Sequence, residues 1–182
     1  NAVSAARATY GLDVTKVVKL EPPLHMAAKF AGSGRAAGEV EGLERLCAVL
    51  DEHQGEFDAL AIASVINTDD QYHEDYFLKN DGSMINPWGG VEAMLTHALS
   101  LLYEIPAAHS PMLESFKVAT FDLGLVEPRL AAEAVSLTFV QCMLKGLQRS
   151  PRIITGNHAM GAPGLVTAAD VSCLIIPGNC VG

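Results

Sequence analysis

The sequence predicts one layered α/β domain over residues 1–182, with a mostly parallel sheet and flanking helices. Two kinds of segment alternate along the chain. In one kind, apolar residues alternate or run continuously, as in strands. In the other, apolar residues recur every three to four positions, as in helices. Residues 57–66 are apolar almost throughout, which is typical of a strand covered on both faces in a parallel sheet. The alternation therefore favours strands joined by helical crossovers.

In the first half, we expect a helix, two extended pieces, a glycine loop, a second helix and a central strand. Glu21-Pro22-Pro23 divides the extended pieces, because proline interrupts a strand. The glycines of residues 31–38 indicate a loop, so the local order is strand, glycine loop, helix. The expected elements are residues 2–10, 14–20, 24–30, 40–53 and 57–66.

In the second half, a long polar loop precedes an apolar helix that Pro106 ends. Pro128 suits the first turn of a later helix, which is apolar nearly all round and is therefore expected to be buried. A Gly- and Pro-rich loop at residues 156–164 separates the last two strands. The expected elements are a loop at 67–90, a helix at 91–104, a strand at 116–121, a helix at 128–148 and strands at 152–155 and 171–177.

The charge and the hydrophobic content of the chain indicate which classes of partner to expect. A net charge of −9 with 12 scattered Lys and Arg residues argues against the binding of nucleic acid, because phosphate groups are bound by clustered basic side chains. The apolar runs are too short to span a bilayer and no signal peptide is recognisable, so we expect a cytoplasmic protein without a membrane partner. With 49% hydrophobic and 18% charged residues, the chain is expected to form a homo-oligomer or to pair with another segment of a longer protein.

Four cysteines lie far apart and form no CxxC pair or zinc-ligand spacing. We expect Cys47, Cys142 and Cys173 to be reduced and buried, because free cysteine packs as a small hydrophobe. Cys180 and Asn179 instead belong to a turn beyond the last predicted strand. A thiol there would be a nucleophile if its pKa were lowered; an incidental thiol in a glycine-rich turn is the alternative.

Two loops have the composition of binding sites. Ser33, Gly34 and Arg35 lie in a glycine loop that would bind a phosphate or carboxylate if a helix followed it, although the spacing departs from the dinucleotide fingerprint and an ordinary turn also explains it. Asp70, His73 and Asp75 are metal-capable, but a solvated acidic loop explains them more simply, so no metal is predicted. No cofactor is indicated.

The densest set of reactive groups lies near residues 86–111. Glu92 falls in the first turn of its helix, where a carboxylate is also stabilised by the helix dipole. His109 and Ser110 follow a short strand-like segment, and we interpret His109 as a proton-transfer or substrate-binding residue rather than as a dyad with Ser110, because adjacent side chains seldom meet. His97 lies away from the apolar face of the helix predicted at residues 91–104, so we interpret it as a group that supports the site from outside or belongs to an interface.

Several motifs resemble an uncharacterised family of bacterial proteins that is well represented in cyanobacteria. They are Asn86-Pro-Trp-Gly-Gly-Val-Glu-Ala-Met-Leu-Thr-His97, Ile105-Pro-Ala-Ala-His-Ser-Pro111, Pro128-Arg-Leu-Ala-Ala-Glu133 and Lys145-Gly-Leu-Gln-Arg-Ser-Pro151. The likeness covers nearly the whole chain and draws attention to Glu92, His97, His109 and Cys180. It implies no activity. Because members of that family are longer, it implies that this chain is a C-terminal-side portion or one subunit of a larger protein.

The sequence leaves three functions open. The first is a hydrolase of an amide or related C–N bond in a small polar metabolite, with catalytic His109, Glu92 and Cys180 at the C-terminal edge of the sheet. Substrate would also meet Ser110, His97 and Asn179. The second is a non-catalytic anion- or nucleotide-binding regulatory module built on residues 32–38, and the third is a structural subunit of a hetero-oligomer.

Overall fold

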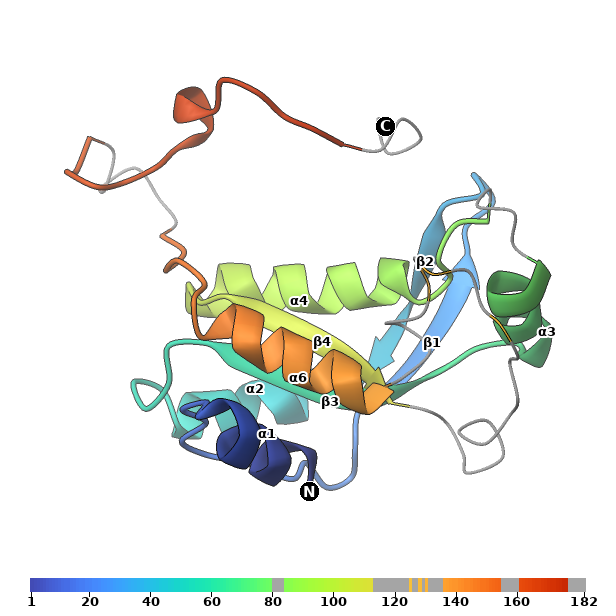
Figure 1. Cartoon of the computed structure of the whole chain (residues 1–182), viewed down its shortest axis with the longest axis horizontal. Coiled ribbons are helices and arrows are strands. Elements are labelled where there is room, and N and C mark those ends of the chain that lie inside the picture. Colours follow the sequence, from blue (N-terminus) through green and yellow to red (C-terminus); the bar gives the residue numbers. More distant parts are fainter. Residues whose placement is uncertain are drawn as a thin grey trace.

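The structure, a computed structural model, describes residues 1–79, 84–112, 125, 128, 130, 136–154 and 161–176. Within them, strands β1 (His25–Phe30), β2 (Ala36–Glu41), β3 (Leu60–Asn67) and β4 (Ala107–Met112) form one sheet. The strand order is β2-β1-β3-β4 (Figure 1). β1, β3 and β4 run parallel, and only β2 is antiparallel to its neighbour. The predicted α/β class with a mostly parallel sheet is confirmed.

The helices pack around this sheet. Figure 1 shows α6 in front of β3 and β4, while the chain after α6 leaves the layered body. The described helices are α1 (Ala2–Tyr10), α2 (Leu43–Glu52), α3 (Asp70–Glu74), the π-helical turn η1 (Asp75–Lys79), α4 (Gly89–Tyr103), α6 (Ser136–Leu147) and the 3₁₀ turn η3 (Ala168–Asp170).

The main core lies between the sheet and the helices α2 and α4. Its sheet side consists of alternate residues that share one face, because successive side chains of a strand point to opposite faces. The helix side repeats every three to four residues, as an amphipathic helix does. The buried members are Leu24, Met26, Ile62 and Ile66 from the sheet side, Leu46 and Leu50 from α2, and Val91, Leu95 and Leu99 from α4. A smaller cluster joins α1 to α6 through Ala6, Leu12, Val140 and Leu144.

The prediction of a strand at residues 14–20 is wrong. Val17 and Val18 are exposed, and this segment has no place in the sheet. The Val14 carbonyl instead accepts a hydrogen bond from Arg7 Nε of α1 at 2.9 Å. The segment therefore packs along a helix end rather than beside a strand.

The glycine loop also has a different setting from the predicted one. Ala31 N–H donates to the Arg35 carbonyl at 2.8 Å and Gly34 has φ +81°, so the loop is a hairpin turn between β1 and β2. Val40 pairs with Met26 in that hairpin. The next helix begins only at Leu43, and the expected order of strand, glycine loop and helix is wrong.

Other expectations hold in part. β3 lies inside the sheet, as predicted, but Ala61 and Ala63 are exposed, so α6 covers the second face of β3 only in part. Residues 152–154 and 171–176 form no strand. Cys142 and Cys173 are exposed rather than buried, whereas Cys47 is partly buried. The predicted strand at residues 116–121 and the start of the helix expected from Pro128 lie largely outside the described residues.

Candidate functional site

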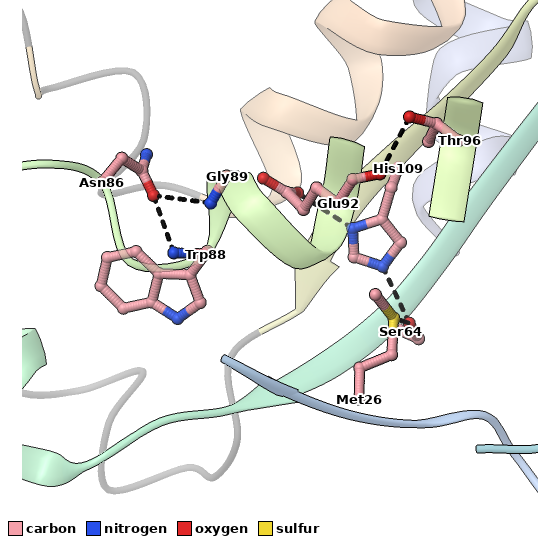
Figure 2. Close-up of polar contacts among 8 residues, drawn as sticks. All are labelled: Met26, Ser64, Asn86, Trp88, Gly89, Glu92, Thr96 and His109. Atoms are coloured by element: carbon pink, nitrogen blue, oxygen red, sulfur yellow. Dashed lines mark hydrogen bonds and ion pairs between the residues drawn. The ribbon is translucent and has the colours of Figure 1, made fainter. Parts of the chain in front are cut away.

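The start of α4 is fixed by Asn86, which the sequence places in a polar segment before the helix. Figure 2 shows its Oδ1 accepting hydrogen bonds from Trp88 N–H at 2.9 Å and Gly89 N–H at 3.1 Å. These amides would otherwise lack partners, because the first turn of a helix has no preceding carbonyls. The Trp88 ring also packs edge-on to Tyr76. Both contacts set where α4 begins, and thereby where Glu92 lies.

Two glycines allow α4 to lie directly on the sheet. A Cβ at Gly90 would be 2.3 Å from the backbone of Ala36 in β2, and a Cβ at Gly38 would be 2.5 Å from Val91 Cβ. Such distances are shorter than any ordinary contact, so neither position has room for a side chain. The Trp88-Gly89-Gly90 motif therefore serves close packing, and it brings the first turn of α4 over the sheet.

Three side chains from three elements form a hydrogen-bonded chain beneath this turn (Figure 2). Glu92 Oε1 of α4 lies 2.9 Å from His109 Nδ1 of β4. His109 Nε2 lies 2.8 Å from Ser64 Oγ of β3. The strand register explains the second contact, because His109 pairs with Ile62, and Ser64 lies two residues further along the same face of β3.

The chemistry of the groups assigns the protons. An ionised carboxylate only accepts hydrogen bonds, so His109 Nδ1 carries the proton donated to Glu92. In a neutral imidazole, Nε2 is then the acceptor, and the Ser64 hydroxyl donates to it. Ser64 Oγ is also 3.2 Å from Met26 Sδ, but a thioether is a weak acceptor and the hydroxyl has only one proton. The Ser64 proton therefore points to the imidazole.

The imidazole is far more buried than the carboxylate. The His109 side chain is 0% exposed and that of Glu92 is 20% exposed. A charged imidazolium at this depth requires a nearby anion, because burial disfavours an isolated charge. Glu92 supplies that anion. The arrangement can thus take a proton from Ser64 and stabilise the imidazolium that results.

The structure separates the other predicted site residues from this chain. Ser110 follows His109 but points to the other side of β4 and is 0% exposed. Among the described residues, its Oγ has no hydrogen-bond partner. His97 is exposed on α4. Ser33, Gly34 and Arg35 are exposed in the β1–β2 hairpin turn, where a strand rather than a helix follows them.

Other predicted residues lie wholly or partly outside the described part of the chain. Cys180 and Asn179 lie outside the described residues, as do the side chains of Asp70 and His73. Asp75 begins η1. Across the described part of the chain, no group of three His, Cys, Asp or Glu side chains is arranged to hold a metal ion.

Ser64 was not predicted as a site residue, although one feature of the sequence distinguishes it. Ser64 is the single polar residue within the run Leu60–Ile66. A hydroxyl in a buried strand needs a partner, since burial without a hydrogen bond is unfavourable. Identifying that partner as His109 required the register between β3 and β4.

A cavity of about 480 Å³ lies at the other end of these strands. Its lining includes Phe57 and Asp58, which precede β3, and Ile105, which precedes β4. It therefore opens at the N-terminal edge of the parallel strands, away from the first turn of α4. It is not part of the Ser64, His109 and Glu92 site.

Comparison with known proteins gives a family without an assigned activity. Residues 1–182 match the family described as "Protein of unknown function (DUF3326)". A curated relative from Synechococcus sp., named "Uncharacterized lipoprotein", is 28% identical over 181 residues, which is 98% of this chain and 48% of the relative. The chain thus spans about half the length of that relative. No solved structure matches the chain.

These findings confirm the resemblance to an uncharacterised family, give it a cyanobacterial relative, and overturn one expectation. The relative is named a lipoprotein, a class of protein held at membranes by an attached lipid, which contradicts the predicted cytoplasmic location. Within the described residues, none of the helices is long and apolar enough to cross a bilayer.

Proposed function

We propose that this chain, which belongs to the DUF3326 family of proteins of unknown function, is a hydrolase that cleaves an amide or related C–N bond in a small polar metabolite. One observation carries the proposal: the hydrogen-bonded chain from Ser64 Oγ through His109 to Glu92, with contacts of 2.8 and 2.9 Å. A hydroxyl, an imidazole and a carboxylate in this order are the elements of an activated serine nucleophile.

The roles follow from the protonation states. Ser64 Oγ attacks the substrate carbonyl carbon while its proton passes to His109 Nε2, and the carbonyl oxygen becomes an oxyanion. Glu92 stabilises the imidazolium through Nδ1–H. The C–N bond then breaks, and His109 returns the proton to the departing amine nitrogen, which leaves an acyl group on Ser64. Water, activated by His109, hydrolyses that ester and releases the acid.

This assignment revises the nucleophile expected from the sequence. Ser64 takes the role given to Cys180, whereas His109 keeps proton transfer and Glu92 becomes the group that orients the imidazole. The location also supports a site, because the first turn of α4 lies near the ends of parallel strands, where ligands commonly bind in α/β folds.

The alternative of an anion-binding module has less support. Its loop is an exposed hairpin turn followed by β2, so no helix N-terminus backs Ser33, Gly34 and Arg35. A purely structural role would also give the buried imidazole these two partners, but it would leave Ser64 unreactive toward electrophiles, so reactivity of Ser64 distinguishes the two functions. The hydrolase is therefore the function that we put to a test.

The test is covalent labelling with a fluorophosphonate, which reacts with serine hydroxyls activated by an imidazole. Intact-mass and peptide analysis should show one adduct, on Ser64. Ser64→Ala should abolish it, whereas Ser110→Ala should retain it, because Ser110 is a neighbouring buried serine without an imidazole partner. A library of small amides then gives the substrate class from turnover by the parent and not by Ser64→Ala. Absence of any adduct on Ser64, with the chain folded, would refute the proposal.

A further inference from the structure

The cavity at the N-terminal edge of the parallel strands has the size of a small-molecule site. Its volume is about 480 Å³, and sites for small molecules usually have about 300–1,000 Å³. Three segments that are distant in the sequence line it: the loop between α2 and β3, the turn between α4 and β4, and the chain that follows α6. Figure 1 shows the end of α4 and the chain that follows α6 at the same end of the molecule.

The less exposed residues that line the cavity offer apolar surface. Ile105 is 9% exposed, and Phe57 and Tyr103 are half-buried. The Tyr103 hydroxyl is hydrogen-bonded to the Cys47 carbonyl and to Asp51 Oδ1 of α2, so Tyr103 presents its ring to the cavity rather than its hydroxyl. We call Phe57, Tyr103 and Ile105 the floor of the cavity. An apolar group of a ligand would be buried against this floor.

Charged side chains of both signs line the same cavity. Asp58 and Arg152 are exposed, and Glu104 is half-buried. Within the described part of the chain, neither Asp58 nor Arg152 forms an ion pair. Opposite charges that border one cavity without pairing can each bind a ligand group of the opposite sign. The cavity therefore matches a ligand that carries both a positive and a negative charge.

Glu104 has a backbone conformation that favours glycine. Its φ is +55° directly after α4, and it is the one non-glycine residue with a positive φ among those that the structure describes. Helices commonly end with glycine at such a left-handed position, because a Cβ is strained there. Residues in strained conformations concentrate at binding and catalytic sites. The conformation of Glu104 thus supports a binding role for this cavity independently of its charges.

We propose that this cavity binds a small zwitterion with an apolar side chain, the chemistry shared by a free amino acid and a dipeptide. The Arg152 guanidinium binds the carboxylate of the ligand, and the Asp58 and Glu104 carboxylates attract its ammonium group. The floor receives its side chain. Ligands of a single charge fit less well, because two carboxylates repel a phosphate and the guanidinium repels a simple cation.

Isothermal titration calorimetry with L-leucine and with leucyl-leucine tests the binding and distinguishes an amino acid from a dipeptide. At least one of the two should bind, and the tighter one identifies the ligand class. Its C-terminal amide, which lacks the carboxylate, and its N-acetyl form, which lacks the ammonium group, should each bind about tenfold more weakly. Absence of binding by both leucine and leucyl-leucine, or equal affinity for the amide and N-acetyl forms, would overturn the proposal.

Two charge-removing variants assign the contacts. Arg152→Gln and Asp58→Asn should each weaken the binding of the zwitterion by about tenfold. Arg152→Gln should leave the affinity for the amide form unchanged, because that form has no carboxylate to bind. Asp58→Asn should likewise leave the affinity for the N-acetyl form unchanged. If Arg152→Gln weakened the zwitterion and its amide equally, Arg152 would not bind the carboxylate and the proposal would be wrong.

Arg149→Gln is the matched control, because Arg149 is exposed on the same segment but does not line the cavity. It should bind the zwitterion as the parent does. Circular dichroism verifies the fold of each variant, which should persist because Asp58, Arg149 and Arg152 are all exposed. Ser64→Ala should also bind as the parent does, since Ser64 is not part of this cavity. The result is therefore independent of whether the chain is a hydrolase. A loss of binding in Arg149→Gln equal to that in Arg152→Gln would overturn the site.

Discussion

Ser110 pairs with Ala63, the residue before Ser64, so these two serines on adjacent strands point to opposite faces of one sheet. Ser64 Oγ is hydrogen-bonded to the imidazole of His109, whereas Ser110 Oγ is buried without a hydrogen bond to any part of the chain that the structure describes. A serine hydroxyl is therefore expected to affect the free energy of unfolding in opposite directions at the two positions. The Ser64 hydroxyl donates to an imidazole, and the Ser110 hydroxyl is desolvated without a partner among the described residues.

This contrast predicts the stability of two alanine variants. Ser110→Ala removes a buried hydroxyl that has no partner, so it should leave the free energy of unfolding unchanged or raise it by about 1 kcal/mol. Ser64→Ala removes the partner of a buried imidazole nitrogen and should lower it by about 1–2 kcal/mol. Urea unfolding followed by circular dichroism measures both. A lower stability for Ser110→Ala would mean that its hydroxyl has a partner in solution.

Glu92→Gln should reduce the activity of Ser64 while the fold is retained. A glutamine amide can donate to Nδ1 and so favour the imidazole form with the proton on Nε2, which cannot accept the Ser64 proton. It also leaves the imidazolium without an anion. The rate of fluorophosphonate labelling should fall by about two to four orders of magnitude. A parental labelling rate in Glu92→Gln would exclude Glu92 from the mechanism, and circular dichroism would verify the fold.

The close approach of α4 to β2 predicts opposite effects for two glycine-to-alanine changes. Gly90→Ala should lower the free energy of unfolding by about 1–3 kcal/mol, because the new methyl group would overlap the backbone of Ala36. Gly146→Ala is the matched control, since nothing lies within 4 Å of a Cβ at that position in α6. It should raise stability by about 0.5–1 kcal/mol through helix propensity. Equal effects at both positions would contradict the packing of α4 on β2.

Asn86→Ala tests the cap of α4. Losing the hydrogen bonds from Trp88 N–H and Gly89 N–H should lower the free energy of unfolding by about 1 kcal/mol. Asn86→Asp should keep most of the parent's stability, because its carboxylate can accept the same two hydrogen bonds. Chemical denaturation of the two variants measures the difference. Equal losses in Ala and Asp would mean that the Oδ1 contacts contribute little.

The sequence was sufficient to predict the helices and strands whose apolar residues face the core. The apolar spacing of α4 and the apolar run of β3 gave the fold class, and the motif positions of Glu92 and His109 indicated a site. Two failures have a physical reason in long-range pairing. Val40 has helical spacing with Leu43, but its contact with Met26 across the hairpin makes it part of β2. Residues 171–176 have strand propensity without a strand partner in the chain described here.

Ser64 shows why the site itself was only partly predictable. Glu92 and His109 stand out as titratable residues near proline and glycine, whereas a serine in an apolar strand resembles an ordinary core substitution. Its significance depends on the register that brings β3 beside β4, which depends in turn on hydrogen bonds such as the one from Leu60 to Pro106. No local pattern fixes a register between strands 45 residues apart.

Tyr103 provides a test of the α2–α4 contact through alkaline titration. Burial raises the pKa of the Tyr103 phenol above its usual value, and its interactions with the Cys47 and Asp51 side chains raise it further. The phenol also donates to the Cys47 carbonyl and to Asp51 Oδ1 of α2. The folded state therefore holds the phenol proton more tightly than the unfolded state does. This contribution is fully present below the unfolded pKa near 10 and is lost as the pH rises through the folded value.

The parent should accordingly lose stability as the pH rises above about 10, and Tyr103→Phe should lose less over the same interval because it has no phenol to ionise. Urea midpoints from pH 8 to 11 measure the slopes, and ultraviolet absorbance near 295 nm reports tyrosinate formation. Tyr10→Phe is the control, since Tyr10 is half exposed at the end of α1. Its slope should match that of the parent. If Tyr103→Phe also matched the parent, Tyr103 would ionise freely, and its hydrogen bonds to α2 would not persist in solution.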